Sequence, residues 1–449
     1  MTVSFRYIRL TKNNEITYKL KIIIMTGKYT LIFDGNFWLH KTYFIGQKIK
    51  QGKPFNFIDE PEADKNLLLW KLAVDFSAEI KRFEGITNRI IYTIDSSSWR
   101  KTAQGESSYK ANRTKSSEID WNIIYQVHDE FIKALESVGV TISRIKGAEA
   151  DDLIFAWSSH LNQIGQNSLI ISGDNDLLQL VNRDNSSGAN TLYYNKFDKD
   201  LHVFPGFKDW LDQEELSTTN DIFNMPLDLV SNTKIHLRDI IRNNKMKLDE
   251  VNTNEFIFKK ILTGDAGDNV SPIDLKIKES KDGKTRVFKV TDNQANQVLD
   301  EFKKDKVFVN QVHLFGDEYI NEICQIAKRI IKIDKDLPEI ITKWELNRTL
   351  VFLHKKCIPE QIIIDMFNQI EEKVSASLSG SRLHSVMDKD QILQSTTYEK
   401  EKSNSFNDST IFKSAMPKSD PSVKNDVVIT STAEKSSGFD DSFWNDLLK

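Results

Sequence analysis

The chain has 449 residues and a formal net charge of −4, and charged residues make up 28% of it. This length is typical of about three domains, or of two domains and a tail. The composition is typical of a soluble globular protein. The charge excludes a histone-like polycation. It does not exclude a nucleic-acid-binding protein, because acidic site residues offset a basic face in the sum.

Cysteine content and hydropathy indicate an intracellular protein. Cys324 and Cys357 are too few for a disulfide framework or a zinc ribbon, so we expect a reducing compartment. The sequence has no run of about 18 apolar residues that would span a membrane. The apolar run at 21–25 is too short for the core of a signal peptide. We therefore expect a cytoplasmic protein that does not contact a membrane.

Four short apolar runs in the first part of the chain are typical of buried β-strands. They cover residues 28–34, 88–95, 140–145 and 168–172. Helical patterns lie between them, and the clearest of these is at Lys65–Phe83. Strands that alternate with helices predict βαβ units and an α/β fold with a mostly parallel sheet.

Each of these strands runs into carboxylates at its C-terminal end. Asp34 and Asp95 end the first two, and the third and fourth lead into the motifs Gly147-Ala148-Glu149-Ala150-Asp151-Asp152 and Gly173-Asp174-Asn175-Asp176. In open α/β sheets, this edge is where binding sites are built. A single Asp at such a place is commonly a helix cap or a turn residue. Capping alone does not explain the same pattern at four strands.

The carboxylates are therefore candidates for a metal site. The set is Asp34, Asp95, Glu149, Asp151, Asp152, Asp174, Asp176, Asp265 and Asp268. Oxygen ligands without His or Cys select Mg²⁺ or Mn²⁺ over Zn²⁺. Two such ions suit the attack of water on a phosphodiester. Acid–base catalysis by one carboxylate pair without a metal is the alternative, but it leaves the other carboxylates unexplained.

A basic segment follows the second strand. Its candidate nucleic-acid contacts are Arg100, Lys101, Tyr109, Lys110 and Arg113. On a helix, Lys110 and Arg113 would face the same side, where their charges would stabilise a phosphate. Tyr109 would stack on a base. The alternative is a solvated basic loop.

The second half of the chain contains a Gly/Asp-rich turn and then helical patterns. The turn lies within 261–273, a hairpin is expected at 276–290, and residues 297–374 are mostly helical, with a short strand-like piece at 329–333. From about residue 379 the chain is Ser-rich and without apolar periodicity, which predicts a disordered tail. The tail ends in an acidic, aromatic peptide.

These motifs, in this order, resemble the 5′-nuclease (flap endonuclease) superfamily and are most similar to its tailed-phage ribonuclease H branch. The resemblance covers residues from about 28 to 375. It is carried by Asp34, Asp95, Tyr109-Lys110-x-Asn112-Arg113, the Glu149 and Asp174 motifs and Thr263-Gly264-Asp265-Ala266-Gly267-Asp268-Asn269. Glu-Ala-Asp-Asp with Gly-Asp-x-Asp and Gly-Asp-x-Gly-Asp-Asn is a highly specific combination.

The resemblance implies a mostly parallel central sheet with helices on both faces, as in a PIN-like 5′-nuclease core. A helix–three-turn–helix and a mainly helical C-terminal region would follow. We expect an N-terminal extension at 1–24, a core at 25–260, a duplex-binding region at 261–378 and a disordered tail at 379–449. Within the core, a helical arch is expected near 98–118 and an insertion near 185–255.

The activity implied is that of a 5′→3′ exonuclease and flap endonuclease with ribonuclease H activity, which removes RNA primers and 5′ flaps during DNA replication. The carboxylates would hold two Mg²⁺ ions, replaceable by Mn²⁺, with Asp152 and Asp265 as members or close neighbours. Lys110 and Arg113 would contact the scissile phosphate from the arch. Gly264, Gly267 and Asn269 would bind the duplex backbone in the helix-hairpin-helix turn, where K⁺ is a candidate ion.

The partners implied are DNA and RNA/DNA duplexes with free 5′ ends or flaps, and the protein would be a monomer in the host cytoplasm if it is of phage origin. We expect the tail to dock on a sliding clamp or a single-strand-binding protein through Phe439, Phe443, Trp444, Leu447 and Leu448. The alternative is that the tail packs on its own body.

Two other functions compete with this interpretation. A PIN-type ribonuclease shares the carboxylate-edged core, but the Gly-Asp-x-Gly-Asp-Asn turn and the large body beyond it argue against it. A catalytically inactive scaffold that binds replication forks would not need the full set of carboxylates. A nucleotide-binding domain is disfavoured because neither GxGxxG nor a Walker A sequence is present.

Overall fold

The computed structural model describes residues 28–49, 55, 57, 59, 61–104, 109–112, 119–184, 186–212, 228–279, 285–304, 316–374, 380–396 and 398. The predicted extension at 1–24, Arg113 and the C-terminal peptide from 438 to 449 lie outside these residues. None of the helices within the described ranges has the length and hydropathy needed to span a bilayer.

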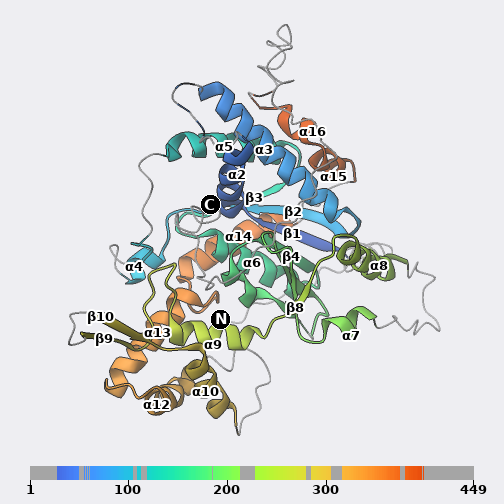
Figure 1. The fold of residues 1–449 in the computed structure, drawn as a ribbon. Helices are drawn as coiled ribbons and strands as arrows, with labels where there is room; N and C mark the ends of the chain where they lie inside the picture. The colour runs from blue at the N-terminus through green and yellow to red at the C-terminus, as the bar shows by residue number, and fades with distance from the viewer. Residues whose placement is uncertain are drawn as a thin grey trace, which may run out of the picture.

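A mostly parallel sheet forms the centre of the molecule (Figure 1). Its strand order is β3-β2-β1-β4-β6-β7-β8. The four predicted strands are β1 (Tyr29–Asp34), β2 (Thr87–Thr93), β3 (Thr141–Ser143) and β4 (Asn167–Ser172). They pair in parallel, and β1 and β4 are buried along their whole length. Strands that are buried on both faces read as nearly continuous apolar runs, which is why the sequence revealed them. The predicted fold class is confirmed.

Helices cover both faces of this sheet (Figure 1). On one side lie α2 (Gly35–Ile49), α3 (Pro61–Arg82) and α5 (Trp121–Ser137), and on the other lie α6 (Ala150–Gln163) and α14 (Glu360–Val374). The helix predicted at 65–83 is α3, whose buried face includes Leu68, Leu72 and Phe76. Short 3-10 helices, η1 (Glu84–Ile86) and η2 (Asn175–Leu180), and the short helix α4 (Arg100–Gln104) join these elements.

The predicted insertion continues the sheet on the β4 side. β6 (Asn190–Asn195) pairs in parallel with β4, and β7 (Leu201–Val203) runs antiparallel to β6. β5 (Asn182–Arg183) and β8 (Leu248–Glu250) add to β6 and β7. Between β7 and β8 the structure describes two further helices, α7 (Phe207–Asp212) and α8 (Asp228–Asn243).

A second apolar core lies below the sheet, around helices of the C-terminal half (Figure 1). It is built by α9 (Thr253–Thr263), α10 (Asp292–Lys303), α12 (Ile320–Ile331) and α13 (Leu337–Val351), with η3 (Asp317–Tyr319) before α12. The predicted hairpin is present as β9 (Leu275–Glu279) and β10 (Thr285–Lys289), which pair antiparallel.

The strand-like piece predicted at 329–333 is wrong. Residues 329–331 are the last residues of α12, and Lys332 ends the helix with a φ of 59°. The isoleucines there belong to one apolar helix face, which buries Ile323, Ala327 and Ile331. A short apolar run does not distinguish a strand from the end of a helix.

The predicted start of the tail at 379 is also too early. The structure has two short helices there, α15 (Gly380–Met387) and α16 (Lys389–Leu393), which pack on α3. Val386, Met387, Ile392 and Leu393 are at most 5% exposed and belong to the main core. The Ser-rich composition hid these few apolar residues, because each helix is shorter than three turns and shows little periodicity.

A chain that ends at residue 379 should be less stable by several kcal/mol than one that ends at residue 400. Each of the four buried side chains contributes about 1.5–3 kcal/mol when it is fully buried. Urea denaturation of the two truncated proteins and of the full chain measures this. The chain that ends at 400 should match the full chain, and equal stability of both truncations would mean that α15 and α16 do not belong to the core.

Candidate metal centre and active site

Four carboxylates meet at the C-terminal edge of the sheet, as the sequence predicts. Asp34 is the last residue of β1 and pairs in register with the last residue of β2, shortly before Asp95. The parallel pairing of β1 with β4 brings Asp174 to the same edge. The backbone N–H of Ala150 donates to Asp95 at 2.6 Å, which places the first turn of α6 and its Asp151 beside them. We call these four residues, Asp34, Asp95, Asp151 and Asp174, the edge cluster.

Asp34 is the most constrained member of the edge cluster. It is buried, and its carboxylate accepts hydrogen bonds from the Phe37 backbone at 3.0 Å and from the Ser172 hydroxyl at 2.8 Å. Burial raises the pKa of Asp34 to about 7, and the charges of Asp95 and Asp174 add to this rise, although the two hydrogen bonds oppose it. Without a cation, the charged form of this carboxylate is therefore unfavourable.

Two further members, Asp151 and Asp174, show the same electrostatic strain. Burial raises the pKa of Asp151 well above its ordinary value, and the charges of Asp174 and Asp34 raise it further. Burial also raises the pKa of Asp174, although Lys260 opposes the shift. A hard divalent cation offsets such repulsion and prefers carboxylate oxygens. The donors of the edge cluster therefore fit the ion that the sequence predicts.

Three further carboxylates form a second group, which we call the turn cluster. Asp176, Asp265 and Asp268 each offer one oxygen, and these oxygens all lie within 4.8 Å of one another. Asp176 follows β4 in η2, while the other two lie in the Gly/Asp-rich turn after α9. The fold thus brings together carboxylates that are about 90 residues apart in the sequence, as the resemblance implies.

The turn that carries Asp265 is held by its own backbone. The N–H groups of Asp265 and Val270 each donate to the other residue's carbonyl, at 2.8 and 2.7 Å. Gly264 has a φ of +74°, and a Cβ atom there would lie 2.3 Å from the Val270 carbonyl oxygen. Only glycine fits this approach. Gly267 and Asn269 lie in the same turn, and Asn269 is exposed.

The sequence analysis missed Lys260, a buried cation between the two halves of the turn cluster. Its ammonium group forms ion pairs with Asp176 and with Asp265, the latter at 2.8 Å. Burial alone would raise the pKa of Asp265, but the charge of Lys260 holds it below its ordinary value. One signal was available: Lys260 interrupts the apolar face of a helix, between Ile257 and Ile261.

Glu149 takes part in a third arrangement, in which cations neutralise it. It is the N-cap of α6, and its carboxylate binds Arg100 Nη1 at 2.8 Å and Lys110 Nζ at 2.6 Å. The Tyr109 hydroxyl lies 3.0 Å from the same carboxylate. Burial opposes the charged form of Glu149, but Lys110 and Arg100 lower its pKa to about 2.

Asp152 was predicted as a metal ligand or a close neighbour of one, and the structure pairs it with Arg100, beside Glu149. It is completely buried and accepts both ends of the Arg100 guanidinium, at 2.7 and 3.1 Å. Its carboxylate also accepts the Trp99 indole N–H and the Glu149 backbone N–H, each at 3.0 Å. These contacts occupy the carboxylate, so its role here is structural.

Two predicted nucleic-acid contacts, Arg100 and Tyr109, are wrong because both side chains are buried. Arg100 is 2% exposed, and Tyr109 is 3% exposed. The Tyr109 hydroxyl lies between Glu149 and Asp268, so the ring is not available to stack on a base. Both residues have the chemistry of a binding loop, and their burial is a property of the fold that the sequence pattern did not reveal.

Lys110 lies at the site, but not on the predicted helix. It sits in a turn at 109–112, with a φ of 56°, and its backbone N–H donates to the Asp268 carbonyl at 3.1 Å. The Asn112 side chain adds a second link to this turn, because it donates to the Ala266 carbonyl at 2.7 Å. The predicted helical alignment of Lys110 with Arg113 is untested, because Arg113 lies outside the described residues.

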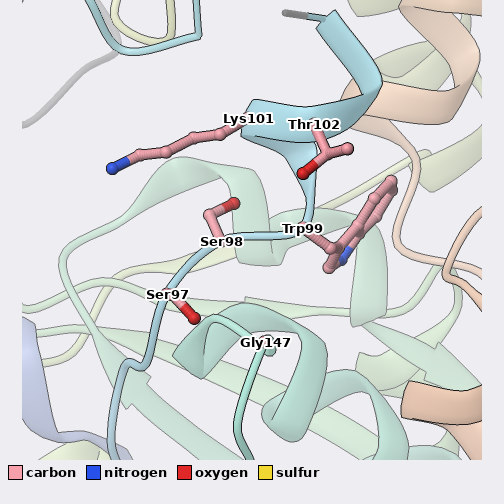
Figure 2. Close-up of a pocket in the computed structure, with 6 residues that line it drawn as sticks. All are labelled: Ser97, Ser98, Trp99, Lys101, Thr102 and Gly147. Carbon is pink, nitrogen blue, oxygen red and sulfur yellow. The ribbon is translucent and has the colours of Figure 1, made fainter. Parts of the chain in front are cut away.

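Lys101 is exposed, as expected of a nucleic-acid contact. It lines a hollow together with Ser97, Ser98, Trp99, Thr102 and Gly147. Figure 2 shows Lys101 extending away from Trp99, with the serine hydroxyls between the helix α4 and Gly147. This polar hollow lies directly beside the residues that hold Asp152 and Glu149 in place.

Asp152→Asn should lower the free energy of unfolding by about 3 kcal/mol, because it removes the carboxylate that binds both ends of the buried Arg100 guanidinium and leaves only Glu149 as its charge partner. Asp151→Asn is the matched control in the same turn of α6. It should leave the metal-free protein as stable or more stable, because it removes charge repulsion within the edge cluster. Urea denaturation in EDTA measures both. If the two variants behaved alike, Asp152 would not be the structural carboxylate.

The metal-free protein should lose stability as the pH rises from about 4 to about 7. In that window folded Asp34 keeps a proton that the unfolded chain releases, because its pKa is raised from 3.8 to about 7. At about 1.4 kcal/mol per pKa unit, the loss amounts to about 4 kcal/mol. Asp34→Asn should remove this part of the pH dependence. Parallel stability profiles of the two proteins in EDTA would contradict the assignment.

Residues 29–204 match the family model of the 5′-3′ exonuclease, N-terminal resolvase-like domain. A 5′-3′ exonuclease of Buchnera aphidicola subsp. Schizaphis graminum is 28% identical over 189 residues, which cover 41% of this chain and 60% of that protein. The 5′-3′ exonuclease of Buchnera aphidicola subsp. Acyrthosiphon pisum is 30% identical over 155 residues, covering 34% and 48%. The chain thus spans about half to three fifths of these relatives.

Among solved structures, the T5 D15 protein co-crystallized with metal ions is 14% identical, with a TM-score of 0.38. The similarity covers 76% of this chain and 99% of that one. The sequence matches and the site motifs agree with each other. Residues 29–204 are therefore similar to the N-terminal domain of 5′-3′ exonucleases, in line with the resemblance to the 5′-nuclease superfamily.

Proposed function

We propose that the protein is a metal-dependent 5′→3′ exonuclease and flap endonuclease with ribonuclease H activity. Its role would be to remove RNA primers and 5′ flaps during DNA replication. The edge cluster is the observation that carries this proposal. Its carboxylates, of which Asp34 is buried and the other three are half-buried, repel one another, and a purely structural site would not keep them together. The match of residues 29–204 to 5′-3′ exonucleases supports the same activity.

Two Mg²⁺ ions, replaceable by Mn²⁺, would be held directly or through water by the edge cluster, Glu149 and the turn cluster. When bound, such ions activate a water molecule and stabilise the leaving oxygen of a phosphodiester. Asp34 is fixed by the backbone of Phe37 and by Ser172, so its oxygens would be held in place for the ion.

Lys110 would supply a positive charge to the scissile phosphate. Its ammonium group lies 2.6 Å from Glu149 and 3.8 Å from Asp268, so it already reaches both the α6 side and the turn side of the site. A positive group at this place would stabilise the charge that develops on the phosphate oxygens. Arg113, three residues further along the chain, would act from the predicted arch.

Duplex binding would involve the turn after α9. Its backbone is held by hydrogen bonds within the turn, and the exposed Asn269 side chain would contact a phosphate, with K⁺ as a candidate ion. Contacts of this kind read the shape of the backbone rather than the base sequence. The exposed Lys101 would add charge on the α4 side.

We further propose that the C-terminal peptide docks on a sliding clamp or a single-strand-binding protein. Its apolar residues, Phe439, Phe443 and Trp444 among them, are spaced among aspartates at the very end of the chain. The chain that ends at residue 400 also tests this idea. It should keep its nuclease activity but lose retention on the immobilised partner, and unchanged retention would exclude the docking role.

Purified full chain should shorten a 5′-labelled RNA-primed duplex and a 5′-flapped duplex in Mg²⁺ but not in EDTA, as seen on a denaturing gel. Asp174→Asn should reduce cleavage more than about 100-fold, beyond what loss of a mere neighbour of a metal ligand costs. DNA binding should change little. Asp129→Asn, on the exposed face of α5, is the matched control and should cleave normally.

Lys110→Ala should slow cleavage by about 100-fold and weaken binding much less, because its charge acts on the transition state. The reverse pattern would move Lys110 to a duplex-binding role. If the unmodified protein bound forks tightly but cleaved no substrate with any divalent ion, the scaffold function would replace the nuclease function.

A further inference from the structure

Lys260 is a charged residue that the proposed chemistry does not use. It lies on the buried face of α9 and is 7% exposed. Its ammonium group pairs with Asp176 and Asp265, two of the three members of the turn cluster. The helix α9 packs against η2, which carries Asp176, so Lys260 links two elements that are distant in the sequence.

The position of Lys260 is stable only because of these carboxylates. Burying an ammonium group costs several kcal/mol unless opposite charges and hydrogen bonds offset it. Conversely, the oxygens of the turn cluster lie within 4.8 Å of one another and need a positive charge between them. Lys260 and the turn cluster therefore stabilise each other in the absence of any metal.

A divalent cation would use the same oxygens. It would have to share Asp176 and Asp265 with Lys260, and the two positive charges would repel each other at short range. Binding of the ion would thus weaken existing ion pairs, and this loss would be subtracted from its binding free energy. Asp34, Asp151 and Asp174 of the edge cluster differ, because the described structure records no ion pair of any of them with a Lys or Arg, although the charge of Lys260 also acts on Asp174.

We propose that Lys260 is a built-in counter-ion of the turn cluster, which replaces a metal ion in the metal-free protein and lowers the affinity of this cluster for divalent cations. Lys260 is thus a positioning residue that sets metal affinity. The inference rests on the proposed function, since it assumes that the turn cluster binds a metal. The pairing of Lys260 with Asp176 and Asp265 also explains how the turn cluster stays assembled before an ion binds.

Lys260→Met should bind Mn²⁺ at the turn cluster about ten-fold more tightly than the unmodified full chain, as measured by titration calorimetry with Mn²⁺ alone. In EDTA the variant should melt at a lower temperature, because three carboxylates lose their counter-ion. Its melting temperature should rise more on addition of Mn²⁺ than that of the unmodified protein. A lysine that served only packing would lower the melting temperature without raising the affinity.

Two control variants separate charge from packing. Lys260→Arg keeps the charge and should keep the affinity of the unmodified protein. Lys259→Met removes the same charge from the neighbouring position of α9, which is less buried, and should leave the affinity for Mn²⁺ unchanged. Asp268→Asn should abolish the Mn²⁺ binding step that Lys260→Met strengthens, which identifies that step with the turn cluster.

Each outcome has a defined meaning. Equal or weaker Mn²⁺ binding by Lys260→Met, with normal binding by the unmodified protein, overturns the inference and leaves the proposed function intact. Absence of Mn²⁺ binding in the unmodified protein overturns both. If Lys260→Met is unfolded in EDTA, recovery of its circular dichroism with Mn²⁺ supports the inference, and failure to recover at saturating Mn²⁺ overturns it.

Discussion

Repulsion among buried carboxylates is the constraint on which the rest of this structure depends. The molecule meets it in three different ways. In the edge cluster the repulsion persists, and the pKa values of Asp34 and Asp151 rise. In the turn cluster Lys260 supplies a positive charge, which holds the pKa of Asp265 down, whereas burial still raises the pKa of Asp176. Around Glu149 two cations are present, and the pKa falls to about 2. The edge cluster is therefore the group in which protein cations compensate the negative charge least, and where an external cation gains most.

Polar side chains around the site connect the sheet to the second apolar core. Arg100, which binds Asp152, also donates to the Leu350 carbonyl of α13 at 3.0 Å. Gln179 of η2 donates to the Val351 carbonyl at 3.1 Å. Its amide oxygen accepts from the Leu353 backbone N–H at 2.8 Å. Asn347 donates to the Ile261 carbonyl of α9 at 2.8 Å. The turn cluster thus lies at a junction of the two cores, so both cores must fold for its carboxylates to meet.

Features set by neighbouring residues in the chain could be predicted from the sequence. Features that depend on which side chains the fold buries could not. Strands that end in Asp were recognisable, because an apolar run and a following carboxylate are adjacent in the chain. Asp152 resembled its neighbour Asp151, and only the fold shows that one faces Arg100 and the other the edge cluster. Tyr109 was misread because exposure is a property of tertiary packing. Lys260 was missed because a single lysine in an amphipathic helix is normally solvated.

The cations around the site differ in how firmly they are bound, and this difference assigns their roles. Arg100 presents a planar fork to Asp152, is 3% exposed in its side chain and cannot lose its charge, so it is a permanent part of the fold. Lys110 makes a single-point contact with Glu149, and its side chain is 18% exposed. Under the proposed function, Lys110 is therefore the cation that could exchange its carboxylate partner for a phosphate. Burial and bond geometry therefore separate the structural cation from the exchangeable one.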